Sequence, residues 1–407
     1  MNQQTRQLPN LARWYCTIFP WYKQLLAERR LTPESPTREL PLITNELLGA
    51  SYYSDLNDHF PHSTMYMTSG TATGVRKRVL YSSSDEEAYV RFRREVIGDF
   101  LRPLARGSVV VSDLGIGHCA ETARRIVTAL GFISHGIDYT RPLREHIALL
   151  NEWRPAALFT MPIILDRLLE TPGALTISLA KVIVVGDVAS RNWRRDVAAR
   201  LGIAADDILD LYGSSEMGAI AAYCPRTGLY HFHDHLLPEV ISTSAALDGT
   251  DAVCGQESST SGDGILVLTS FQRDYFPALR YVMHDVITGL RQIEWRGRAV
   301  YAFERIEGRC GGDFKHGERV SYHDICDAVG EVFPGCAFNV QNTGGLVIEI
   351  GAESVLPGQK EALLMALVKR VPDVRQMIDS GLVGEILIRG TGQPTSPRTA
   401  KRVLRPA

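Results

Sequence analysis

The sequence has 407 residues, of which 45% are hydrophobic and 22% charged, and its formal net charge is −2. This length suits two domains, or one large domain with a smaller companion, and the composition is typical of a globular protein with a full core. The near-neutral charge argues against broad binding to nucleic acid or anionic membranes, and no apolar run approaches the roughly 18 to 20 residues of a membrane span.

The N-terminus and the cysteines indicate the cellular setting. Residues 11–19 are apolar, but the stretch is short and contains Arg13, so we interpret it as a packing helix rather than a signal peptide. The seven cysteines are scattered and include no Cys-x-x-Cys pair. An odd, scattered set favours a reduced, cytoplasmic setting.

The first half of the chain changes from a helical to an alternating pattern. Residues 1–60 are predicted to be helical and rich in loops, with Pro33, Pro36 and Pro41 as breaks. From residue 107, short apolar runs alternate with amphipathic segments, which predicts a wound α/β sheet. Strands are expected at 108–112, 132–137, 157–160, 180–185 and 208–211, and helices at 120–130, 143–152, 163–170 and 191–201.

The pattern changes again after Tyr212. Further short strands are expected at 229–232, 238–242 and 264–270, and then, in a segment rich in glycine and charge, at 337–341, 346–350 and 385–388, with a helix at 360–371. The sequence therefore predicts an α/β fold. A large N-terminal domain with wound mixed sheets, residues 1–306, is followed by a small α+β domain, residues 307–407.

A segment rich in hydroxyl groups and glycine, residues 66–81, is the first candidate site. Its small residues are Thr68, Ser69, Gly70, Thr71, Thr73 and Gly74, and Arg76, Lys77 and Arg78 follow them. Glycines let backbone N–H groups converge on an anion, and the basic run supplies charge for phosphate oxygens. The Gly-Lys-Ser/Thr of a Walker A loop is missing. The alternative interpretation is a surface hairpin with a solvated basic strand.

The second candidate site is the DLYGSSEMG segment, residues 210–218. A strand is expected to end at Tyr212, and a tight turn then presents Glu216. Ligands of α/β sheets bind where the carboxyl ends of strands open. Tyr212 suits stacking on a base, and Glu216 suits Mg²⁺, which prefers one or two carboxylates with phosphate oxygens. The alternative is a strand-to-turn corner with a solvent-facing glutamate.

Taken together, residues 60–330 resemble the adenylate-forming superfamily of acyl-CoA synthetases and ligases, in particular phenylacetate-CoA ligase and its relatives. Residues 69–77 are similar to the family's SGTTGxPK loop, and 212–218 (YGSSEMG) match its Tyr-Gly-x-Ser/Thr-Glu motif. Residues 279–286 (LRYVMHDV) are similar to IRYRTGDL. The VVGD of 184–187 falls at the family's turn near adenine, and 307–320 are similar to its hinge segment.

The resemblance implies a role for each matched residue. It assigns the hydroxyl-rich loop to the ATP phosphates, Asp285 to the ribose hydroxyls, and Glu216 to Mg²⁺. The other residues implied in nucleotide binding are Gly186, Asp187, Tyr212, Gly213, Ser214, Ser215 and Arg309. The acid pocket is expected between 113–118 and the Tyr212 turn, with Gly117, His118, Met217 and Gly218 as candidates.

The same resemblance implies a two-step reaction. ATP and Mg²⁺ activate a small carboxylic acid as an acyl-adenylate, with release of pyrophosphate. A thiol, of CoA or of the phosphopantetheine arm of a carrier protein, then takes the acyl group. Two alternatives stay open: transfer to an amine, a hydroxyl or a partner protein, and a nucleotide-binding scaffold without catalysis.

The sequence departs from the family's pattern near its C-terminal end. Gly311 and Gly312 replace the hinge aspartates. The family's C-terminal lysine aligns with Thr399, or with Lys401 after a shift of two residues. We assign Lys401 to this role, and the alternative cations are Lys77 and Lys315.

Some relatives also bind zinc. The candidate ligands here are Cys224, His231, His233 and Cys310. Since side chains alternate along a strand, His231, His233 and His235 are expected to share one strand face. A tetrahedral site needs four such ligands. The alternative is a strand with exposed imidazoles.

Overall fold

The computed structural model describes residues 3–53, 60, 62–67, 78–115, 118–170, 175–186, 189–242, 258–309, 314–316, 318–320, 322–334, 336, 338–342 and 345–391. The chain forms two compact units. The first comprises Met1–Tyr66, Arg78–Pro103 and Leu209–Gly311, and the second comprises Met67–Lys77, Leu104–Ile208 and Gly312–Ala407. None of the helices in these described ranges has the length and apolarity that a membrane crossing requires.

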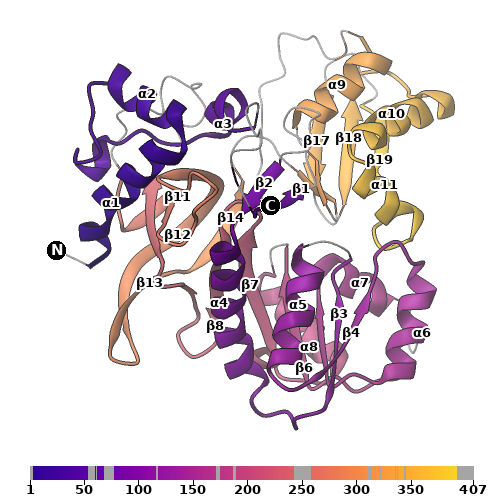
Figure 1. Cartoon of the computed structure of the whole chain (residues 1–407). Helices are drawn as coiled ribbons and strands as arrows, with labels where there is room; N and C mark the ends of the chain where they lie inside the picture. Colours follow the sequence, from indigo (N-terminus) through magenta and orange to yellow (C-terminus); the bar gives the residue numbers. More distant parts are fainter. Residues whose placement is uncertain are drawn as a thin grey trace. The chain divides into compact units, whose positions relative to one another are not determined.

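The first unit combines N-terminal helices with an antiparallel sheet (Figure 1). Its helices are α1 (Gln3–Ile18), α2 (Pro20–Glu28), the 3₁₀ turn η1 (Thr37–Glu39), α3 (Asn45–Ser51) and α4 (Ser83–Leu101). Its strands are β1 (Thr64–Met67), β2 (Arg78–Tyr81), β7 (Ile208–Ser214), β8 (Gly218–Cys224), β9 (Leu229–Phe232), β10 (Leu236–Ile241), β11 (Gly262–Ser270), β12 (Tyr281–Trp295), β13 (Arg298–Phe303) and β14 (Arg305–Arg309). The main sheet runs β10-β11-β12-β13-β9-β8-β7, and β14 pairs with β12.

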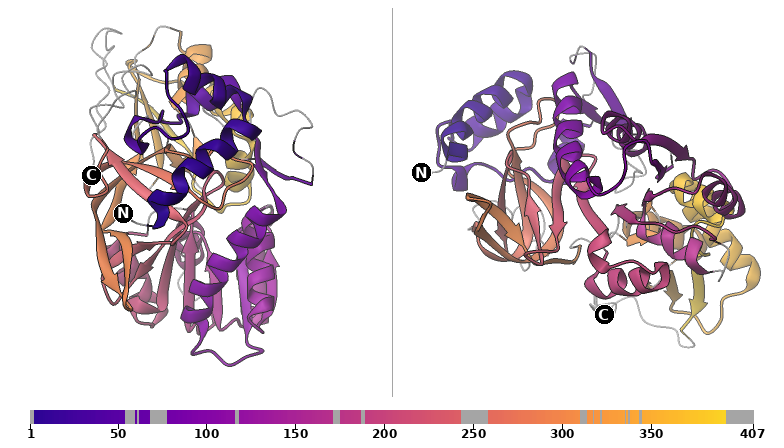
Figure 2. Two further views of the ribbon diagram at one scale, coloured as in Figure 1. Left: turned by 60° about the vertical axis from the view of Figure 1, so that its left-hand side comes forward. Right: turned by 90° about the horizontal axis from the view of Figure 1, so that it is seen from below.

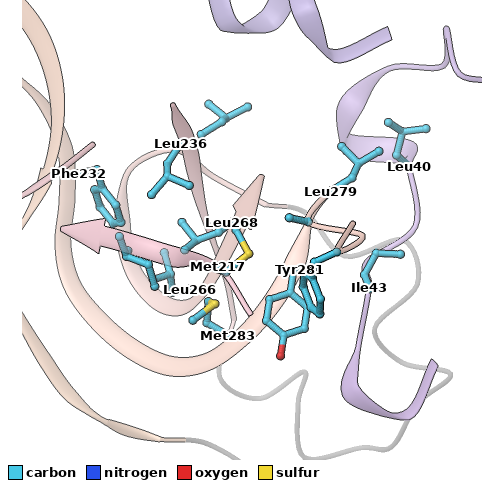
Figure 3. Packing of buried hydrophobic residues seen from close by; sticks show 14 of the residues in the cluster. Leu40, Ile43, Met217, Phe232, Leu236, Leu266, Leu268, Leu279, Tyr281 and Met283 are labelled. Atoms are coloured by element: carbon cyan, nitrogen blue, oxygen red, sulfur yellow. The ribbon is translucent and has the colours of Figure 1, made fainter. Parts of the chain in front are cut away.

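The core of the first unit explains why residues 1–30 are helical. Buried apolar side chains recur at helical spacing through α1 and α2, and they are Leu8, Ala12, Tyr15, Phe19, Tyr22 and Leu26. They belong to one hydrophobic cluster with residues of β8 to β12. Figure 3 shows part of this cluster, in which Leu40 and Ile43 lie near Leu279 and Tyr281. The expected packing helix at 11–19 is therefore confirmed.

The second unit contains the expected alternation of strands and helices. Its elements are β3 (Val109–Asp113), α5 (His118–Ala129), β4 (Ile133–Ile137), α6 (Leu143–Trp153), β5 (Ala157–Thr160), α7 (Pro162–Glu170), β6 (Lys181–Val185), α8 (Arg191–Leu201) and the 3₁₀ turn η2 (Ala205–Asp207). The strands lie in the order β4-β3-β5-β6, and the neighbours β3/β4, β3/β5 and β5/β6 are parallel. The order reverses between β3 and β5, where α/β sheets open a ligand crevice at the carboxyl ends of strands. Asp113 and Thr160 face each other in register at this place.

The C-terminal part of the second unit is an α+β segment with its own core (Figure 2). Its elements are β15 (Phe314–His316), β16 (Glu318–Val320), α9 (Tyr322–Val332), β17 (Phe338–Asn342), β18 (Leu346–Ile350), α10 (Pro357–Arg370), α11 (Pro372–Asp379) and β19 (Leu387–Gly390). Strands β17 and β18 are antiparallel, whereas β18 and β19 are parallel, so α10 and α11 form the crossover between them. The mixed α/β class is confirmed, and the domain boundary at residues 306/307 stays a prediction.

Candidate functional site

The turn between β7 and β8 presents the YGSSEMG segment. Ser214 ends β7, and its hydroxyl oxygen accepts the Met217 N–H at 3.1 Å. Gly218 starts β8 with φ at +73°, which favours glycine. A β-carbon on Gly213 would lie 2.4 Å from Arg93 Nη2 and 2.7 Å from the Gly218 carbonyl oxygen. Close packing therefore requires glycine at 213, and the positive φ favours it at 218.

Glu216 projects from this turn. The residue is 8% exposed, and its carboxylate makes no hydrogen bond or ion pair to any residue that the structure describes. A nearly buried carboxylate is costly unless a partner of opposite charge or a set of donors accompanies it. Its two free oxygens thus fit a Mg²⁺ ion, which prefers hard oxygen ligands and keeps other positions for phosphate and water.

Tyr212 and Asp285 lie together although they are far apart in the sequence. The Tyr212 hydroxyl on β7 donates a hydrogen bond to Asp285 Oδ2 on β12. The Tyr212 ring packs edge-on against Phe303, with ring centroids 6.1 Å apart. Asp285 is also the register partner of Arg309 on β14. The structure therefore brings three of the predicted nucleotide-binding residues to one place in the first unit.

The second unit carries polar side chains at the carboxyl ends of β3 and β5. Asp113 Oδ2 lies 2.8 Å from His146 Nδ1, and His146 Nε2 lies 3.0 Å from the Arg141 carbonyl oxygen. Burial raises the pKa of Asp113, and the hydrogen bond from His146 opposes this change. Asp113 Oδ1 and the hydroxyl of the buried Thr160 have no hydrogen-bond partner among the described residues. These groups therefore lie where the strand order reverses between β3 and β5.

Other predicted residues of the second unit are only partly described. His118 begins α5 and is half-buried, and Gly186 follows β6 with φ at +94°. Several predicted residues lie outside the described ranges, namely Thr68, Ser69, Gly70, Thr71, Thr73, Gly74, Lys77, Gly117, Asp187, Cys310, Gly311, Gly312, Thr399 and Lys401. The acid pocket expected between 113–118 and the Tyr212 turn stays a prediction.

The predicted histidine face is wrong. Strand β9 ends at Phe232, so only His231 of the three histidines lies on it. His231 is near Trp295, with ring centroids 5.1 Å apart, and its Nε2 lies 2.8 Å from the Thr227 hydroxyl oxygen. His233 and His235 follow the strand, and their rings lie 5.4 and 4.0 Å from that of Phe92 on α4. Because the chain turns after Phe232, His233 and His235 stack on each other with ring centroids 5.9 Å apart, whereas His231 packs against Trp295.

The predicted zinc ligands accordingly do not converge where they are described. Within the described ranges, no group of three or more His, Cys, Asp or Glu side chains is placed to hold a metal ion. Cys224 ends β8, and Cys310 lies outside the described residues. The donor set does not fit a tetrahedral zinc site, and we derive no step through zinc.

Sequence analysis missed the side chains that pack against the turn. Tyr81 donates from its hydroxyl to the Ser215 carbonyl at 2.7 Å, and burial raises the pKa of this tyrosine. Arg93 and Arg273 donate to other carbonyls of the same turn. The one available signal was the Ser-x-x-Asp capping pattern of Ser82 and Asp85, which marks the start of α4. Nothing in the spacing of these residues along the chain connects them to Tyr212.

Comparisons with known proteins bear on the class of the molecule. The chain is 42% identical over 386 residues to a fumarate–(S)-2,3-diaminopropanoate ligase of Enterobacter agglomerans, with 93% of this chain and 94% of the relative covered. The family described as the fumarate–diaminopropanoate ligase C-terminal domain matches residues 315–392.

Solved structures share the fold. A 2-hydroxyisobutyryl-CoA ligase in complex with 2-HIB-AMP and CoA aligns with a TM-score of 0.77 at 17% identity, over 98% of this chain and 88% of that chain. An amide bond synthetase from Marinactinospora thermotolerans aligns with a TM-score of 0.54 at 17% identity, over 82% of this chain and 66% of that chain.

The fold is shared with solved ligases, and the 42% identical relative is a ligase of the adenylate-forming class. The chain belongs to the adenylate-forming family that includes the fumarate–(S)-2,3-diaminopropanoate ligase, and it is an AMP-forming acid ligase. The superfamily expected from the sequence is thus confirmed, whereas the phenylacetate-CoA ligase-like branch stays a prediction.

Proposed function

We propose that the chain adenylates a small dicarboxylic acid such as fumarate and transfers the acyl group to an amine. The observation that carries this proposal is the 42% identity to a fumarate–(S)-2,3-diaminopropanoate ligase over nearly the whole of both chains. The free carboxylate of Glu216 supports it, because the adenylating step requires a ligand for the metal that accompanies ATP. CoA and a phosphopantetheine arm, the thiol acceptors expected from the sequence, become alternative acceptors in the test below.

The reaction has two steps. An oxygen of the acid attacks the α-phosphorus of ATP, the bond from that phosphorus to the bridging oxygen breaks, and pyrophosphate leaves. The amine nitrogen then attacks the acyl carbon, the bond from this carbon to the phosphate oxygen breaks, and AMP leaves while the nitrogen loses a proton. Neither step needs a covalent nucleophile from the protein, so positioning and electrostatics supply the rate.

The residues take the following parts in this proposal. Glu216 holds Mg²⁺, which neutralises charge on the phosphate oxygens when it is bound. Tyr212 borders the adenine together with Gly186 and Asp187, and Asp285 accepts the ribose hydroxyls. Residues 68–74 are assigned to the ATP phosphates, Lys401 to the role of the C-terminal cation, and Arg309 to the hinge. The acid pocket is assigned to Gly117, His118, Met217 and Gly218.

Pyrophosphate release with MgATP tests the first step. We expect pyrophosphate release with fumarate and less release with aryl, fatty and amino acids, because pyrophosphate leaves only when the acid supplied is adenylated. Glu216→Gln keeps the shape of the side chain but removes its charge, and it should lower the rate by about 100-fold or more. No release with any acid, while ATP still binds, would refute adenylation.

The second step is tested by product analysis. Wild-type protein is given fumarate, MgATP and either (S)-2,3-diaminopropanoate, CoA or a phosphopantetheinylated carrier protein. We expect an amide and AMP with the amine, and no thioester. A thioester with CoA, and no amide, would leave adenylation intact but overturn the proposed acceptor.

A further inference from the structure

Three buried side chains hold the main chain of the 212–216 turn. Arg93 Nη2 donates to the Tyr212 carbonyl at 2.9 Å, and Arg273 Nε donates to the Glu216 carbonyl at the same distance. The Tyr81 hydroxyl donates to the Ser215 carbonyl at 2.7 Å. We call Tyr81, Arg93 and Arg273 the turn clamp.

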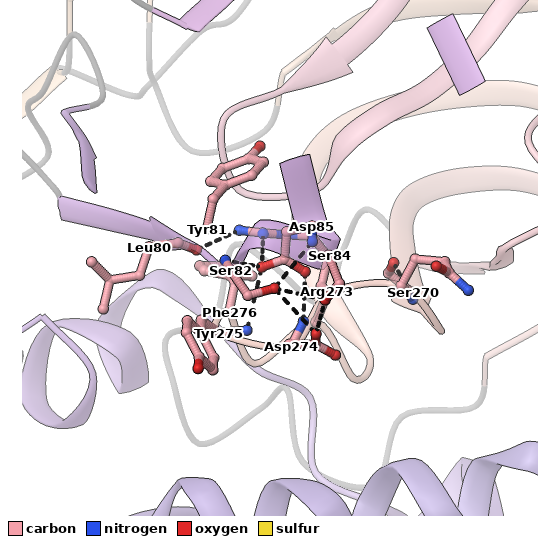
Figure 4. A network of polar contacts seen from close by, with 12 residues as sticks. Leu80, Tyr81, Ser82, Ser84, Asp85, Ser270, Arg273, Asp274, Tyr275 and Phe276 are labelled. Carbon is pink, nitrogen blue, oxygen red and sulfur yellow. Dashed lines mark hydrogen bonds and ion pairs between the residues drawn. The ribbon is translucent and has the colours of Figure 1, made fainter. Parts of the chain in front are cut away.

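Arg273 is the most constrained member of the turn clamp (Figure 4). The residue is 3% exposed, and its Nη1 lies 2.6 Å from Asp85 Oδ2. Its Nη2 donates to the Leu80 carbonyl at 3.0 Å, and its guanidinium carbon lies 3.8 Å from the centre of the Tyr81 ring. Two hydrogen bonds and the ion pair with Asp85 therefore fix the orientation of the planar guanidinium.

Asp85 is itself held in place, so the ion pair is anchored on both sides. Its carboxylate accepts the backbone N–H of Ser82 at 2.9 Å and that of Asp274 at 2.8 Å. Burial raises the pKa of Asp85, and the charge of Arg273 opposes this effect. Removing one partner of such a pair leaves an uncompensated buried charge, which is strongly destabilising.

Arg93 holds the other end of the turn. It is 2% exposed, and its Nη1 has no hydrogen-bond partner among the described residues. Its Nη2 also fills the space that a β-carbon on Gly213 would need. Through the Tyr212 carbonyl, Arg93 fixes the residue whose hydroxyl donates to Asp285.

We propose that Arg273 is a positioning residue for the adenylating step. Its hydrogen bond fixes the peptide group of Glu216, and through it the direction of the carboxylate that holds the metal in the proposed function, on which this inference rests. Arg93 and Tyr81 fix the preceding residues of the turn in the same way. The substrate chemistry does not involve the guanidinium of Arg273, which acts through Glu216.

Arg273→Lys tests this role because lysine keeps the charge beside Asp85. A lysine ammonium cannot donate at once in the three directions that the guanidinium occupies. The hydrogen bond to the Glu216 carbonyl is then lost or weakened, and the carboxylate is held less firmly. We expect the Mg²⁺ concentration for half-maximal pyrophosphate release to rise by about tenfold. The KM for the acid should stay within about twofold, because the buried guanidinium acts on the metal ligand through the Glu216 carbonyl.

Arg280→Lys is the matched control. Arg280 is 1% exposed, its Nε lies 3.3 Å from Glu239 Oε2, and its Nη2 donates to the Ser258 hydroxyl at 3.0 Å. It is thus an equally buried, paired arginine, and none of its hydrogen bonds reaches the 212–216 turn. This variant should lower the urea midpoint of unfolding but leave the Mg²⁺ requirement unchanged.

Tyr81→Phe is a second, milder probe of the same clamp. It removes the hydrogen bond to the Ser215 carbonyl and leaves every buried charge in place. We expect the Mg²⁺ concentration for half-maximal release to rise by about threefold, in the same direction as for Arg273→Lys.

The outcomes separate this inference from the proposed function. If wild-type protein releases pyrophosphate and Glu216→Gln loses that activity, the adenylating step of the proposed function stands. An unchanged Mg²⁺ requirement in Arg273→Lys and in Tyr81→Phe would then overturn the positioning role. An equal rise of the Mg²⁺ requirement in Arg280→Lys would also overturn it, because the effect would then come from a general loss of stability and not from the turn clamp. No release by the wild-type protein would refute both proposals.

Discussion

His235 is a buried histidine without a charged partner at its ring. It is 8% exposed, and its ring stacks on that of Phe92 at 4.0 Å and 15°. Its Nδ1 has no hydrogen-bond partner among the described residues. Burial, together with the positive charges of Arg91 and Arg93, lowers the pKa of His235 to about 3. The folded protein therefore keeps this ring neutral well below pH 6.

This histidine makes the stability of the fold depend on pH. The pKa of His235 in the folded protein lies below its ordinary value. Its contribution to the unfolding free energy is therefore complete above about pH 6.5 and is lost as the pH falls toward 3. Between pH 7 and pH 5, the unfolding free energy should fall by about 2 kcal/mol on account of His235. Burial shifts His233 in the same direction.

Urea unfolding at pH 7 and pH 5 measures this contribution. In His235→Gln, the loss of unfolding free energy between the two pH values should be smaller than in the wild-type protein by about 2 kcal/mol. His62→Gln, which makes the same change at an exposed position, serves as the control. Equal losses in wild-type protein and His235→Gln would contradict the prediction.

Sequence reasoning identified the residues of the site that belong to local motifs. Tyr212, Glu216 and Asp285 could be found because each lies in a short pattern with a chemical reason. Arg93 and Arg273 could not be found, because they reach the turn from segments 119 and 57 residues away from their acceptors. Hydrogen bonds to backbone carbonyls leave no pattern in the side-chain sequence, so such partners become visible only with the fold.

At the scale of single elements, two glycines should respond in opposite ways to the same change. Gly202 ends α8 in the left-handed region, with φ at 70°, whereas Gly330 lies within α9. A β-carbon at either position would meet nothing within 4 Å, so only the backbone decides the outcome. We expect Gly202→Ala to lower the unfolding free energy by about 1 kcal/mol, and Gly330→Ala to raise it by about 0.5 to 1 kcal/mol.

Urea unfolding followed by circular dichroism measures both glycine variants. Each variant is the control for the other, since both add the same methyl group but are expected to change the unfolding free energy in opposite directions. A loss in both variants would show that packing, rather than backbone conformation, governs these positions.

Elements with a regular pattern were predicted well, and the others were missed. The parallel strands β3 to β6 were found within two residues of their bounds, because short strands that alternate with amphipathic helices form a distinctive pattern. Strand β12 was missed because its residues, YVMHDVITGLRQIEW, do not alternate strictly between apolar and polar; it pairs with β11 and β14 along its first part and with β13 along its last. Helix α4 was missed because its buried face includes charged side chains, among them Asp85, Glu86 and Arg93.

At the scale of the whole molecule, the C-terminal segment has a hydrophobic core of its own. Its buried apolar cluster consists entirely of residues from Val320 to Ile388, and the family match begins and ends close to the same bounds. We expect a protein of residues 310–407 alone to unfold cooperatively in urea.

A pair of leucine variants tests this independence. Leu367 is fully buried in that core, whereas Leu356 is 61% exposed. Leu367→Ala should cost about 3 kcal/mol and abolish cooperative unfolding of the fragment, and Leu356→Ala should leave it intact. A fragment that shows no cooperative transition even without substitution would mean that this core needs the rest of the chain.

The hydrogen bonds of Tyr15 also determine when the first unit can be completed during synthesis. Its hydroxyl oxygen lies 3.0 Å from the carbonyl oxygen of Arg273, which is 258 residues later in the chain. At about 5 to 20 residues per second, a ribosome needs roughly 13 to 50 s to add that many residues. For most of this time, until β8 begins at Gly218, the apolar stripe of α1 and α2 has no native partner from β8 to β12. We therefore expect nascent chains shorter than about 220 residues to expose this stripe and to be captured by chaperones that bind apolar segments.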